Sequence, residues 1–98
     1  MIVEITASAE RDLENIADYI ARDSALAALR FIDALQAKCV DLGELPYAFP
    51  LIPRYEKHGI RRRVHGNYLI LYRVAAERVV VLRILHGAVA YETVLFPD

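Results

Sequence analysis

The stretch from His58 to Gly87 constrains the fold of this 98-residue chain more than any other segment. It contains the dipeptide Gly66-Asn67, whose residues both accept positive φ, flanked by runs in which apolar side chains alternate with charged or aromatic ones. A two-residue turn there pairs His65 with Tyr68, Arg63 with Ile70, and Arg61 with Tyr72. Another turn within Ala75–Arg78 leads to a third strand, so the sequence predicts an antiparallel three-stranded meander.

The predicted pairing divides the meander into two faces. One face carries Arg61, Arg63, His65, Tyr68, Ile70 and Tyr72, whereas the other carries Ile60, Arg62, Val64, Leu69, Leu71 and Arg73. The second set is the more apolar, so we expect it to lie beneath helices while the first set stays open. With a two-residue second turn, the open face gains Arg83, Val79, Val81 and Leu85, and the covered face gains Val80, Leu82 and Ile84. An open face that is both apolar and cationic is suited to docking an amphipathic acidic segment.

The N-terminal segment predicts a short strand and an amphipathic helix. Ile2–Ile5 has the composition of a strand, and Ser8 stands where a helix N-cap belongs, so a helix is expected from about Ala9 to Arg22. Acidic side chains follow in the first turn, where the helix dipole favours negative charge. The apolar residues recur at the three- and four-residue spacing of one helix face: Leu13, Ile16, Ala17 and Ile20.

A second helix follows almost at once. Ser24 offers a new cap, an apolar stripe runs from Ala28 to Leu42, and Gly43 is the expected stop. Two helices joined by so short a connection form an antiparallel hairpin. Three prolines keep Leu45–Lys57 extended, and its apolar residues predict that it packs along the domain. The sequence therefore predicts one α+β domain over residues 1–98, with a helical hairpin on a mainly antiparallel sheet in the order β-α-α-β-β-β.

Charge is distributed unevenly along the chain. Met1–Leu45 carries four basic and nine acidic residues, a net charge of −5, whereas residues 54–86 carry eight basic and two acidic residues, a net charge of +6. The formal charge of the whole chain is only −1. A dipole of this kind steers an anionic partner, either a nucleic acid or an acidic protein segment, toward the meander.

The composition limits the class of protein further. No apolar run reaches the roughly 18 residues of a membrane span and no signal-peptide pattern is present, so we expect a cytoplasmic protein without membrane contact. The single cysteine, Cys39, forms neither an internal disulfide nor a metal cluster, and its place on the helix stripe predicts a core residue. No motif predicts a cofactor. A hydrophobic fraction of 56% is high for so small a domain and predicts an interface with a partner.

The order of these elements and a set of short motifs resemble the ParE/RelE superfamily of toxins from type II toxin–antitoxin systems. The residues that carry the resemblance are Ala9, Asp12-Leu13, Ile16 and Tyr19-Ile20 in the first helix, Pro46 in the connection, Gly59-Ile60-Arg61, Tyr68-Leu69-Ile70 and Tyr72-Arg73-Val74 in the sheet, and Arg83-Ile84-Leu85-His86-Gly87 at its end. The resemblance spans nearly the whole chain, and the ordered set is most similar to the ParE branch.

Members of the superfamily differ in target: RelE-like toxins cleave messenger RNA on the ribosome, whereas ParE-like toxins inhibit DNA gyrase. A RelE-like ribonuclease is expected to carry arginine, arginine and tyrosine at three positions where this chain has Leu69, Val89 and Leu95. RNA cleavage needs a base, an acid and cations on the phosphorane, and these side chains supply none of them. The resemblance therefore implies a non-enzymatic gyrase inhibitor without catalytic residues, neutralised by a ParD-like antitoxin and reaching DNA only through that antitoxin.

The resemblance also implies where the partners bind. An acidic helical arm of the antitoxin is expected on Arg61, Arg63, Arg73, Arg83, Tyr68 and Tyr72, and the target is expected at His86, Tyr91, Leu95 and Phe96. Two alternatives stay open. In the first, the chain is a ribosome-dependent mRNA endoribonuclease of RelE type, with His86 and Tyr91 as a different acid–base pair. In the second, ranked last, residues 61–65 bind single-stranded nucleic acid and stack bases on Tyr68 and Tyr72.

Overall fold

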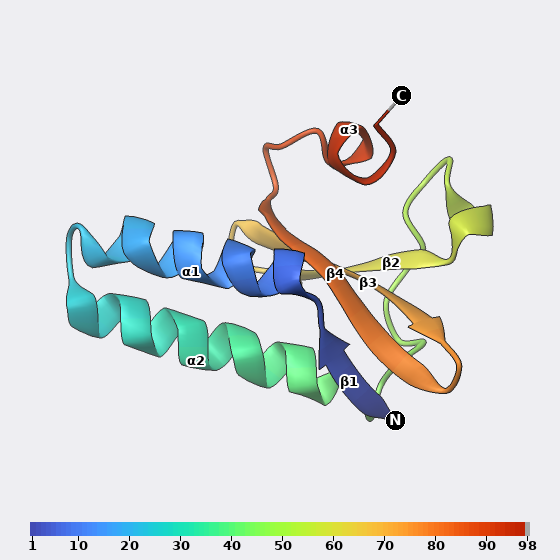
Figure 1. Ribbon diagram of the computed structural model, residues 1–98, viewed down its shortest axis with the longest axis horizontal. Coiled ribbons are helices and arrows are strands. Elements are labelled where there is room, and N and C mark those ends of the chain that lie inside the picture. The colour runs from blue at the N-terminus through green and yellow to red at the C-terminus, as the bar shows by residue number, and fades with distance from the viewer. Residues whose placement is uncertain (98) are drawn as a thin grey trace.

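The fold is one mixed sheet with a helical hairpin on one face (Figure 1). The computed structural model describes residues 1–97. Its elements are β1 (Ile2–Ile5), α1 (Ala7–Ala21), α2 (Ala25–Asp41), the 3₁₀ turn η1 (Glu56–His58), β2 (Ile60–His65), β3 (Tyr68–Ala75), β4 (Arg78–His86) and α3 (Tyr91–Leu95). The strand order is β1-β4-β3-β2, with β1 parallel to β4 and the other neighbours antiparallel. The predicted fold class and element order are confirmed, and α3 is an addition that the sequence pattern did not reveal.

The first helix begins two residues earlier than predicted. Thr6 rather than Ser8 is its N-cap, and the Thr6 hydroxyl accepts a hydrogen bond from the Ala9 amide at 3.2 Å. The same hydroxyl donates to the carbonyl oxygen of Val81 at 2.9 Å, so it also joins the helix start to β4. Thr6 and Ser8 both have a hydroxyl that could cap the helix, and the hydrogen bond to Val81 explains why Thr6 is the cap. The predicted cap of α2 at Ser24 is confirmed.

Two-residue turns connect the three antiparallel strands. Gly66 adopts a φ of 58° in the first turn, and every pair predicted across that turn is confirmed. The second turn consists of Ala76 and Glu77, whose φ values of 52° and 59° lie in the left-handed region that non-glycine residues adopt at a cost. The two-residue length assumed for this turn is therefore correct, although its sequence contains neither glycine nor asparagine.

The helices cover the face of the sheet opposite to the one predicted. The side chains buried against α1 and α2 are Ile70 and Tyr72 of β3 and Val79, Val81 and Ile84 of β4. We refer to this side as the helix-covered face. The prediction assigned the helices to the more apolar set of side chains. It is wrong because Arg61 and Arg63, which share the covered side, find hydrogen-bond acceptors within the fold and do not need to reach water.

A β-bulge in β4 decides where the later residues of that strand point. The register between β3 and β4 shifts between Leu71 and Tyr72, because Leu82 is an extra residue in β4. Strand residues alternate between faces, so one extra residue moves all that follow it to the other side. Arg83 consequently pairs with Leu71 and not with Ile70, which corrects the predicted register of this arginine.

The other side of the sheet, predicted to lie under helices, is covered instead by the connection and the C-terminal residues. Ile52, Ile60, Leu71, Leu85 and Tyr91 form a second buried cluster, with Tyr55, Leu69, Leu82, Val94, Leu95 and Phe96 packed around it. We refer to this side as the tail-covered face and to residues 88–97 as the tail. Figure 1 shows α3, within the tail, as a separate element beyond the end of β4. Both faces of the sheet are therefore buried over much of their area.

Candidate protein-interaction site

Arg61 and Arg63, two predicted antitoxin contacts, hold the connection and α2 onto β2. Arg63 Nη1 donates to Asp41 Oδ2 at 2.9 Å and to the Lys38 carbonyl oxygen at 3.1 Å, while Arg61 Nη1 donates to the Phe49 carbonyl oxygen at 2.7 Å. The last carbonyl groups of a helix carry partial negative charge, so a guanidinium at the end of α2 is stabilising. The Arg63 side chain is only 15% exposed. Both arginines are thus committed to contacts within the chain.

Arg83, the third predicted contact, is paired with Asp12 of α1. Its Nε and Nη2 atoms donate to the two carboxylate oxygens, each at 2.8 Å, and the Ile84 amide donates to Asp12 Oδ2 at 2.9 Å. Asp12 is 8% exposed. Its hydrogen bonds raise the pKa of Arg83 further above the usual range, so the guanidinium stays charged. The pair joins α1 to β4.

The two tyrosines of the predicted antitoxin surface are packed into the fold. Tyr72 has no exposed area, and its hydroxyl donates to the Pro46 carbonyl oxygen at 3.0 Å. Burial raises the pKa of Tyr72. Tyr68 is half-buried, with its ring edge-on to Phe31 at 5.5 Å and to His86 at 5.4 Å between centroids. Base stacking on Tyr72, as in the nucleic-acid alternative, is incompatible with this burial.

Arg73 is the one exposed residue of the predicted antitoxin set. It lies opposite Ile60 at the margin of the tail-covered face, and no described residue forms an ion pair with it. Sequence reasoning missed Arg62, which pairs with Leu71 and is therefore the diagonal neighbour of Arg73 on the same side. Val64, 59% exposed, follows Arg62 on that side. We refer to Arg62, Val64 and Arg73 as the cationic strip.

An open cavity of about 260 Å³ lies where the β2–β3 turn meets the end of β4. The residues that line it include Gly66, Asn67, Tyr68, Leu69, His86 and Ala88. His86, a predicted target contact, is exposed, and its Nδ1 accepts a hydrogen bond from the Ala88 amide at 3.1 Å. The neutral imidazole therefore carries its proton on Nε2. Leu69 faces this cavity at one of the positions where a RelE-like ribonuclease is expected to have an arginine.

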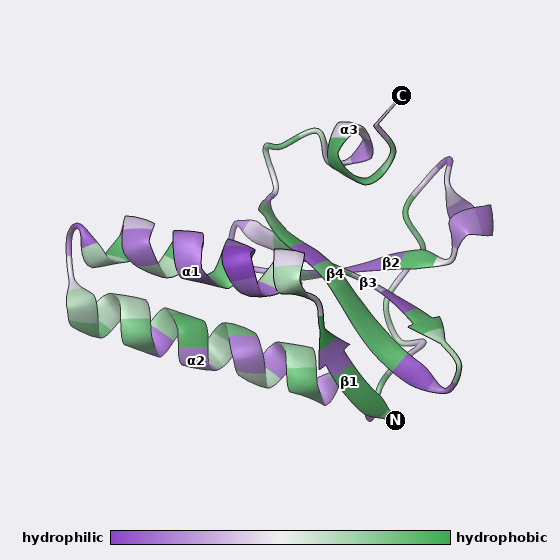
Figure 2. Ribbon diagram, in the orientation of Figure 1, coloured by the Kyte–Doolittle hydropathy of each residue, from purple (hydrophilic) through white to green (hydrophobic). Residues whose placement is uncertain are grey.

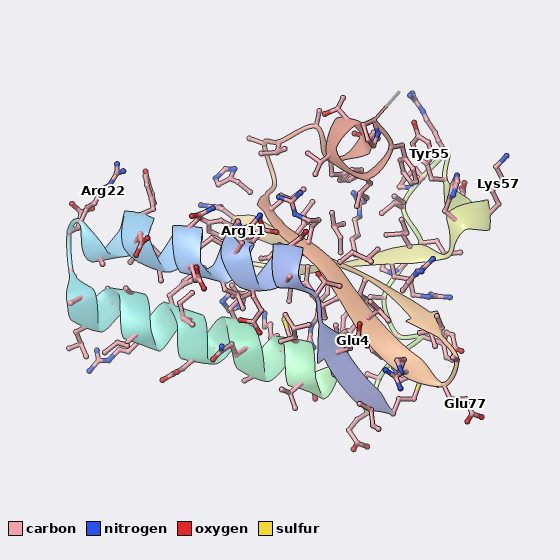
Figure 3. All side chains as sticks on the ribbon, in the orientation of Figure 1. Glu4, Arg11, Arg22, Tyr55, Lys57 and Glu77 are labelled. Atoms are coloured by element: carbon pink, nitrogen blue, oxygen red, sulfur yellow. The ribbon has the colours of Figure 1, made fainter. Side chains whose placement is uncertain are left out.

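The other predicted target contacts, Tyr91, Leu95 and Phe96, belong to the tail and turn toward the sheet. Tyr91 is 8% exposed within the second cluster, and it does not line the cavity that holds His86. The Phe96 ring stacks on that of Tyr55, with centroids 4.2 Å apart. Figure 3 shows Tyr55 close to α3 and Lys57 pointing away from the molecule. The apolar side chains of the tail thus hold it in place.

The described residues offer little to a metal ion or to thiol chemistry. Among residues 1–97, no group of three or more histidine, cysteine, aspartate or glutamate side chains is arranged to hold a metal ion. Cys39 is buried as predicted, and burial raises the pKa of its thiol to about 11. A thiol of this kind stays protonated and unreactive near neutral pH. Within the same residues, no helix has both the length and the apolar character to cross a membrane.

The accessible features of this α+β domain thus include a cationic strip and an open cavity. A family model described as the ParE toxin of the type II toxin–antitoxin system parDE matches residues 3–91. The chain belongs to this family and is the toxin of a type II toxin–antitoxin system, as the sequence motifs predicted. No curated protein matches the sequence closely enough to serve as a relative.

Two solved structures have the same fold. A chromosomal ParDE toxin–antitoxin system from P. aeruginosa matches with a TM-score of 0.73 at 20% sequence identity, covering 88% of this chain and 95% of that chain. The toxin–antitoxin complex RelBE2 from Mycobacterium tuberculosis matches with a TM-score of 0.63 at 28% identity, covering 87% of this chain and 95% of that chain. The predicted ParE/RelE fold is therefore confirmed.

Proposed function

We propose that this toxin inhibits DNA gyrase and is neutralised by a ParD-like antitoxin. The family match over residues 3–91 supports a ParE-type target. The observation that carries the proposal is the composition of the His86 cavity, because none of its lining residues is a lysine or an arginine. A phosphorane with its extra negative charge has no cation to stabilise it there. The toxin therefore acts by binding, and gyrase as a target requires it to be cytoplasmic.

The three positions at which a RelE-like ribonuclease is expected to carry charged or proton-transferring groups support the same conclusion. Leu69 lines the cavity, Leu95 packs on the second cluster, and Val89 is 42% exposed. None of these side chains exchanges a proton. His86 and Tyr68 are the titratable groups that line the cavity. Because Nδ1 of His86 accepts the hydrogen bond from Ala88, the neutral ring carries its proton on Nε2 and has no free nitrogen to act as a base.

A supercoiling assay tests the gyrase target. We expect the purified chain to inhibit supercoiling or to trap cleaved DNA, and its antitoxin to reverse the effect. Translating ribosomes with a labelled messenger RNA serve as the parallel assay. Rapid cleavage of that RNA, together with normal gyrase activity at excess toxin, would identify the chain as a ribonuclease and contradict the proposal.

For the antitoxin, we propose that an acidic arm contacts the cationic strip. Arg73 is kept from the sequence prediction and Arg62 joins it, since both are free of ion pairs among the described residues and lie diagonally on one side. Arg61, Arg63 and Arg83 contribute indirectly, because they fix the strands that present the strip. Charges at the rim of an interface act mainly on orientation and association rate, so apolar contacts nearby supply most of the affinity.

Charge reversal distinguishes the strip from the internal arginines. We expect the double variant Arg62→Glu, Arg73→Glu to associate with the antitoxin at least about tenfold more slowly than the wild type, with unchanged melting temperature. Arg11→Glu is the control, because Arg11 is exposed and belongs to α1 (Figure 3), whereas the strip belongs to β2 and β3. Wild-type association by the double variant would remove the strip from the interface.

For the target, we propose contact around His86 and the outer surface of the tail. The buried Tyr91 and the half-buried Leu95 and Phe96 then act by positioning the tail. We expect His86→Ala to weaken gyrase inhibition while antitoxin binding and melting temperature stay unchanged. Deletion after Gly87 is a poorer test, because it uncovers the apolar tail-covered face and destabilises the domain. Full inhibition by His86→Ala would exclude this histidine from the target contact.

A further inference from the structure

The three antiparallel strands and the loop before them contain eight lysines and arginines, and the fold uses four of these. Arg61, Arg63 and Arg83 are held by acceptors within the fold, and Arg78 forms an ion pair with a glutamate of β1 at 3.0 Å. The other four form no side-chain hydrogen bond or ion pair with residues 1–97. We refer to these four as the unpaired cations: Arg54, Lys57, Arg62 and Arg73.

A closed loop brings Arg54 and Lys57 to the start of β2. The Ile52 amide donates to the Ile60 carbonyl oxygen at 2.9 Å, so residues 53–59 leave the sheet and return to it at the same point. Backbone hydrogen bonds of 2.9 and 3.0 Å within the loop fix the turn η1. Figure 2 shows η1 as a hydrophilic element, and Lys57 points away from the molecule in Figure 3. A loop of fixed shape thus presents both cations to solvent.

The two arginines of the cationic strip lie directly beside this loop. Arg73 pairs with Ile60, at the point where the loop joins β2, and Arg62 is its diagonal neighbour. Such neighbours on adjacent strands lie roughly 7 to 8 Å apart. Residues 54–73 contain six basic side chains and one acidic side chain, that of Glu56, and so carry a net charge of +5. The unpaired cations therefore form one basic surface at this end of the sheet.

Arg54 adopts a backbone conformation that costs an arginine free energy. Its φ of 76° lies in the left-handed region, where glycine is the ordinary residue. No contact of its side chain with residues 1–97 compensates this strain, since the side chain makes neither a hydrogen bond nor an ion pair with them. Backbone strain of this kind gathers at ligand-binding positions. A glycine would suit the turn better, so the arginine at this position indicates a ligand.

The positive charge at this end acts locally, although the chain as a whole has a formal charge of −1. Exposed charges are screened over about 8 Å at physiological ionic strength. The molecule extends over 40 Å along its longest axis, and Figure 1 shows the tip of the helical hairpin at one end of that axis and η1 at the other. The acidic side chains of the hairpin therefore do not cancel the unpaired cations.

The arrangement of the unpaired cations fits an extended row of anions better than one small anion. They belong to a loop and to two strands, and none of them lines the His86 cavity. A ligand that meets all four must carry several negative charges along its length. The phosphate backbone of DNA has this form. Gyrase holds duplex DNA, so a toxin bound to this enzyme lies close to such a backbone.

We propose that the unpaired cations contact the phosphates of the DNA that gyrase holds, so that the toxin binds the enzyme–DNA complex more tightly than the enzyme alone. This inference rests on the proposed gyrase target. The contact is direct, whereas the resemblance implies contact with DNA only through the antitoxin. Phosphate contacts position a protein without reading the base sequence. The antitoxin arm proposed for the cationic strip covers two of the four cations, so the arm and the DNA exclude each other.

The salt dependence of DNA binding tests the contact on the full chain. Fluorescence anisotropy follows the binding of a short labelled duplex at a series of salt concentrations. Each phosphate that a cation neutralises contributes about −0.9 to the slope of log K against log salt, so four cations predict a slope of about −3.6. The affinity should then fall roughly 150-fold between about 50 and 200 mM salt. A slope near zero would overturn the inference.

Matched variants locate the contact. The double variant Arg54→Gln, Lys57→Gln removes two cations outside the strip, and we expect its slope to be about −1.8. The control Arg11→Gln, Arg30→Gln removes two exposed cations of α1 and α2 and should keep the wild-type slope. Glu56→Gln removes the carboxylate of the loop and should raise the affinity at least about twofold, a gain that misfolding does not produce. Equal losses in the control, or a wild-type slope in the loop variant, would overturn the assignment.

Titration of labelled toxin with gyrase, in the presence and absence of DNA, tests the contact in the complex. We expect DNA to tighten the binding of the wild type at least about tenfold, and that of the double variant Arg54→Gln, Lys57→Gln less than about threefold. Both changes are at exposed positions, so the melting temperature should stay that of the wild type. Equal tightening of the two proteins by DNA would overturn the role of these cations.

The same experiments separate this inference from the proposed target. A wild type that inhibits gyrase but binds it equally with and without DNA would overturn the DNA contact and leave the target in place. Duplex binding with the expected slope, together with normal gyrase activity, would contradict the target and support the DNA contact. An oligoglutamate peptide serves as the competing anion. If it bound more tightly than a duplex at the same salt concentration, the cations would belong to an acidic protein segment and the inference would fail.

Discussion

Both faces of the sheet are covered, but different interactions hold the two covers. On the helix-covered face, Arg63 and Asp12 make hydrogen bonds between the helices and the strands, and Tyr72 ties the connection in the same way. On the tail-covered face, Ala88 and Val89 donate hydrogen bonds to His86 at the end of β4, but residues 90–97 make none to the sheet or the connection in the part of the chain that the structure describes. Beyond Val89, apolar and aromatic contacts hold the tail on the sheet.

This difference between the two covers distinguishes arginines that hold the fold together from arginines that a partner can reach. Hydrogen-bonded ion pairs fix geometry, whereas apolar contact is non-directional and lets a cover open locally. Arg61, Arg63 and Arg83 therefore stabilise one arrangement of helices and strands, while Arg62 and Arg73, at the margin of the looser side, form no ion pair with residues 1–97. A basic side chain in this sequence therefore indicates a binding surface only where no hydrogen-bond acceptor within the fold already holds it.

The largest loss of stability is expected from removing the carboxylate of Asp12, which joins α1 to β4. Asp12→Ala leaves the Ile84 amide and the partly buried Arg83 without their acceptor, so we expect a loss of about 3 kcal/mol in the free energy of unfolding. Urea denaturation measures it. Glu4→Ala, which breaks an ion pair whose side chains are both about half exposed, is the matched control and should lose about 0.5 kcal/mol or less. Equal losses would show that the buried pair has no special role.

A smaller effect is expected on the tail-covered face. Phe96→Ala removes the ring that stacks on Tyr55, and we expect a loss of about 1 to 2 kcal/mol because the ring is only half-buried. Hydrogen exchange should show faster exchange of the Thr93 and Phe96 amides, with β3 and β4 unchanged, since the tail opens locally. Faster exchange throughout the sheet would instead show that the two covers unfold together.

The pH dependence of stability should come partly from His65 on the helix-covered side. Burial, with Lys38 and Arg63 nearby, lowers the pKa of His65 below its ordinary value of 6.5, and its Nδ1 is buried without a partner among the described residues. The unfolded chain therefore takes up this proton at a higher pH than the folded chain, so stability falls as the pH drops through and below 6.5.

Thermal melts at about pH 7.5 and about pH 5.5 measure this contribution. The melting temperature of the wild type should fall more between the two than that of His65→Gln. His58→Gln changes an exposed histidine and should behave as the wild type does. An identical pH dependence in His65→Gln would exclude His65 as the cause.

The smallest effect concerns Cys39. Its buried thiol, with a pKa raised to about 11, should not react with a disulfide reagent at neutral pH in the folded chain. In urea the reaction should be complete. Reaction in the folded chain at the rate of the unfolded one would mean that α2 leaves the sheet often, and the helix cover would then be as loose as the tail.

Local sequence patterns were sufficient for the element order, the hairpin pairing and the burial of Cys39. The Gly66-Asn67 dipeptide fixes the register by itself, because turn length determines which residues face each other. The start of α1 was misplaced by two residues, since Ser8 and Thr6 both suit a cap and only the distant carbonyl of Val81 distinguishes them. That contact belongs to the folded chain and leaves no local signal.

The site was predicted less well than the fold because the side of the sheet depends on partners far away in sequence. Counting apolar residues favoured the wrong face, since Asp41 and the Phe49 carbonyl oxygen make Arg63 and Arg61 acceptable beneath the helices. The bulge at Leu82 had no local marker either. Family membership, in contrast, could be predicted from the ordered motifs, because this set of different motifs extends along nearly the whole chain.

The bulge in β4 is therefore as informative as the composition of the strand. If β4 kept Leu82 but paired regularly, Leu82 would lie opposite Leu71 and Arg83 opposite Ile70, which would turn a guanidinium into the hydrocarbon layer under α1 and rotate Ile84 outward. A related toxin whose strand has the same length but no bulge would need an apolar side chain in the place of Arg83 to keep the same helix contact. A comparison of the two sequences alone would thus read a change of orientation as a change of chemistry.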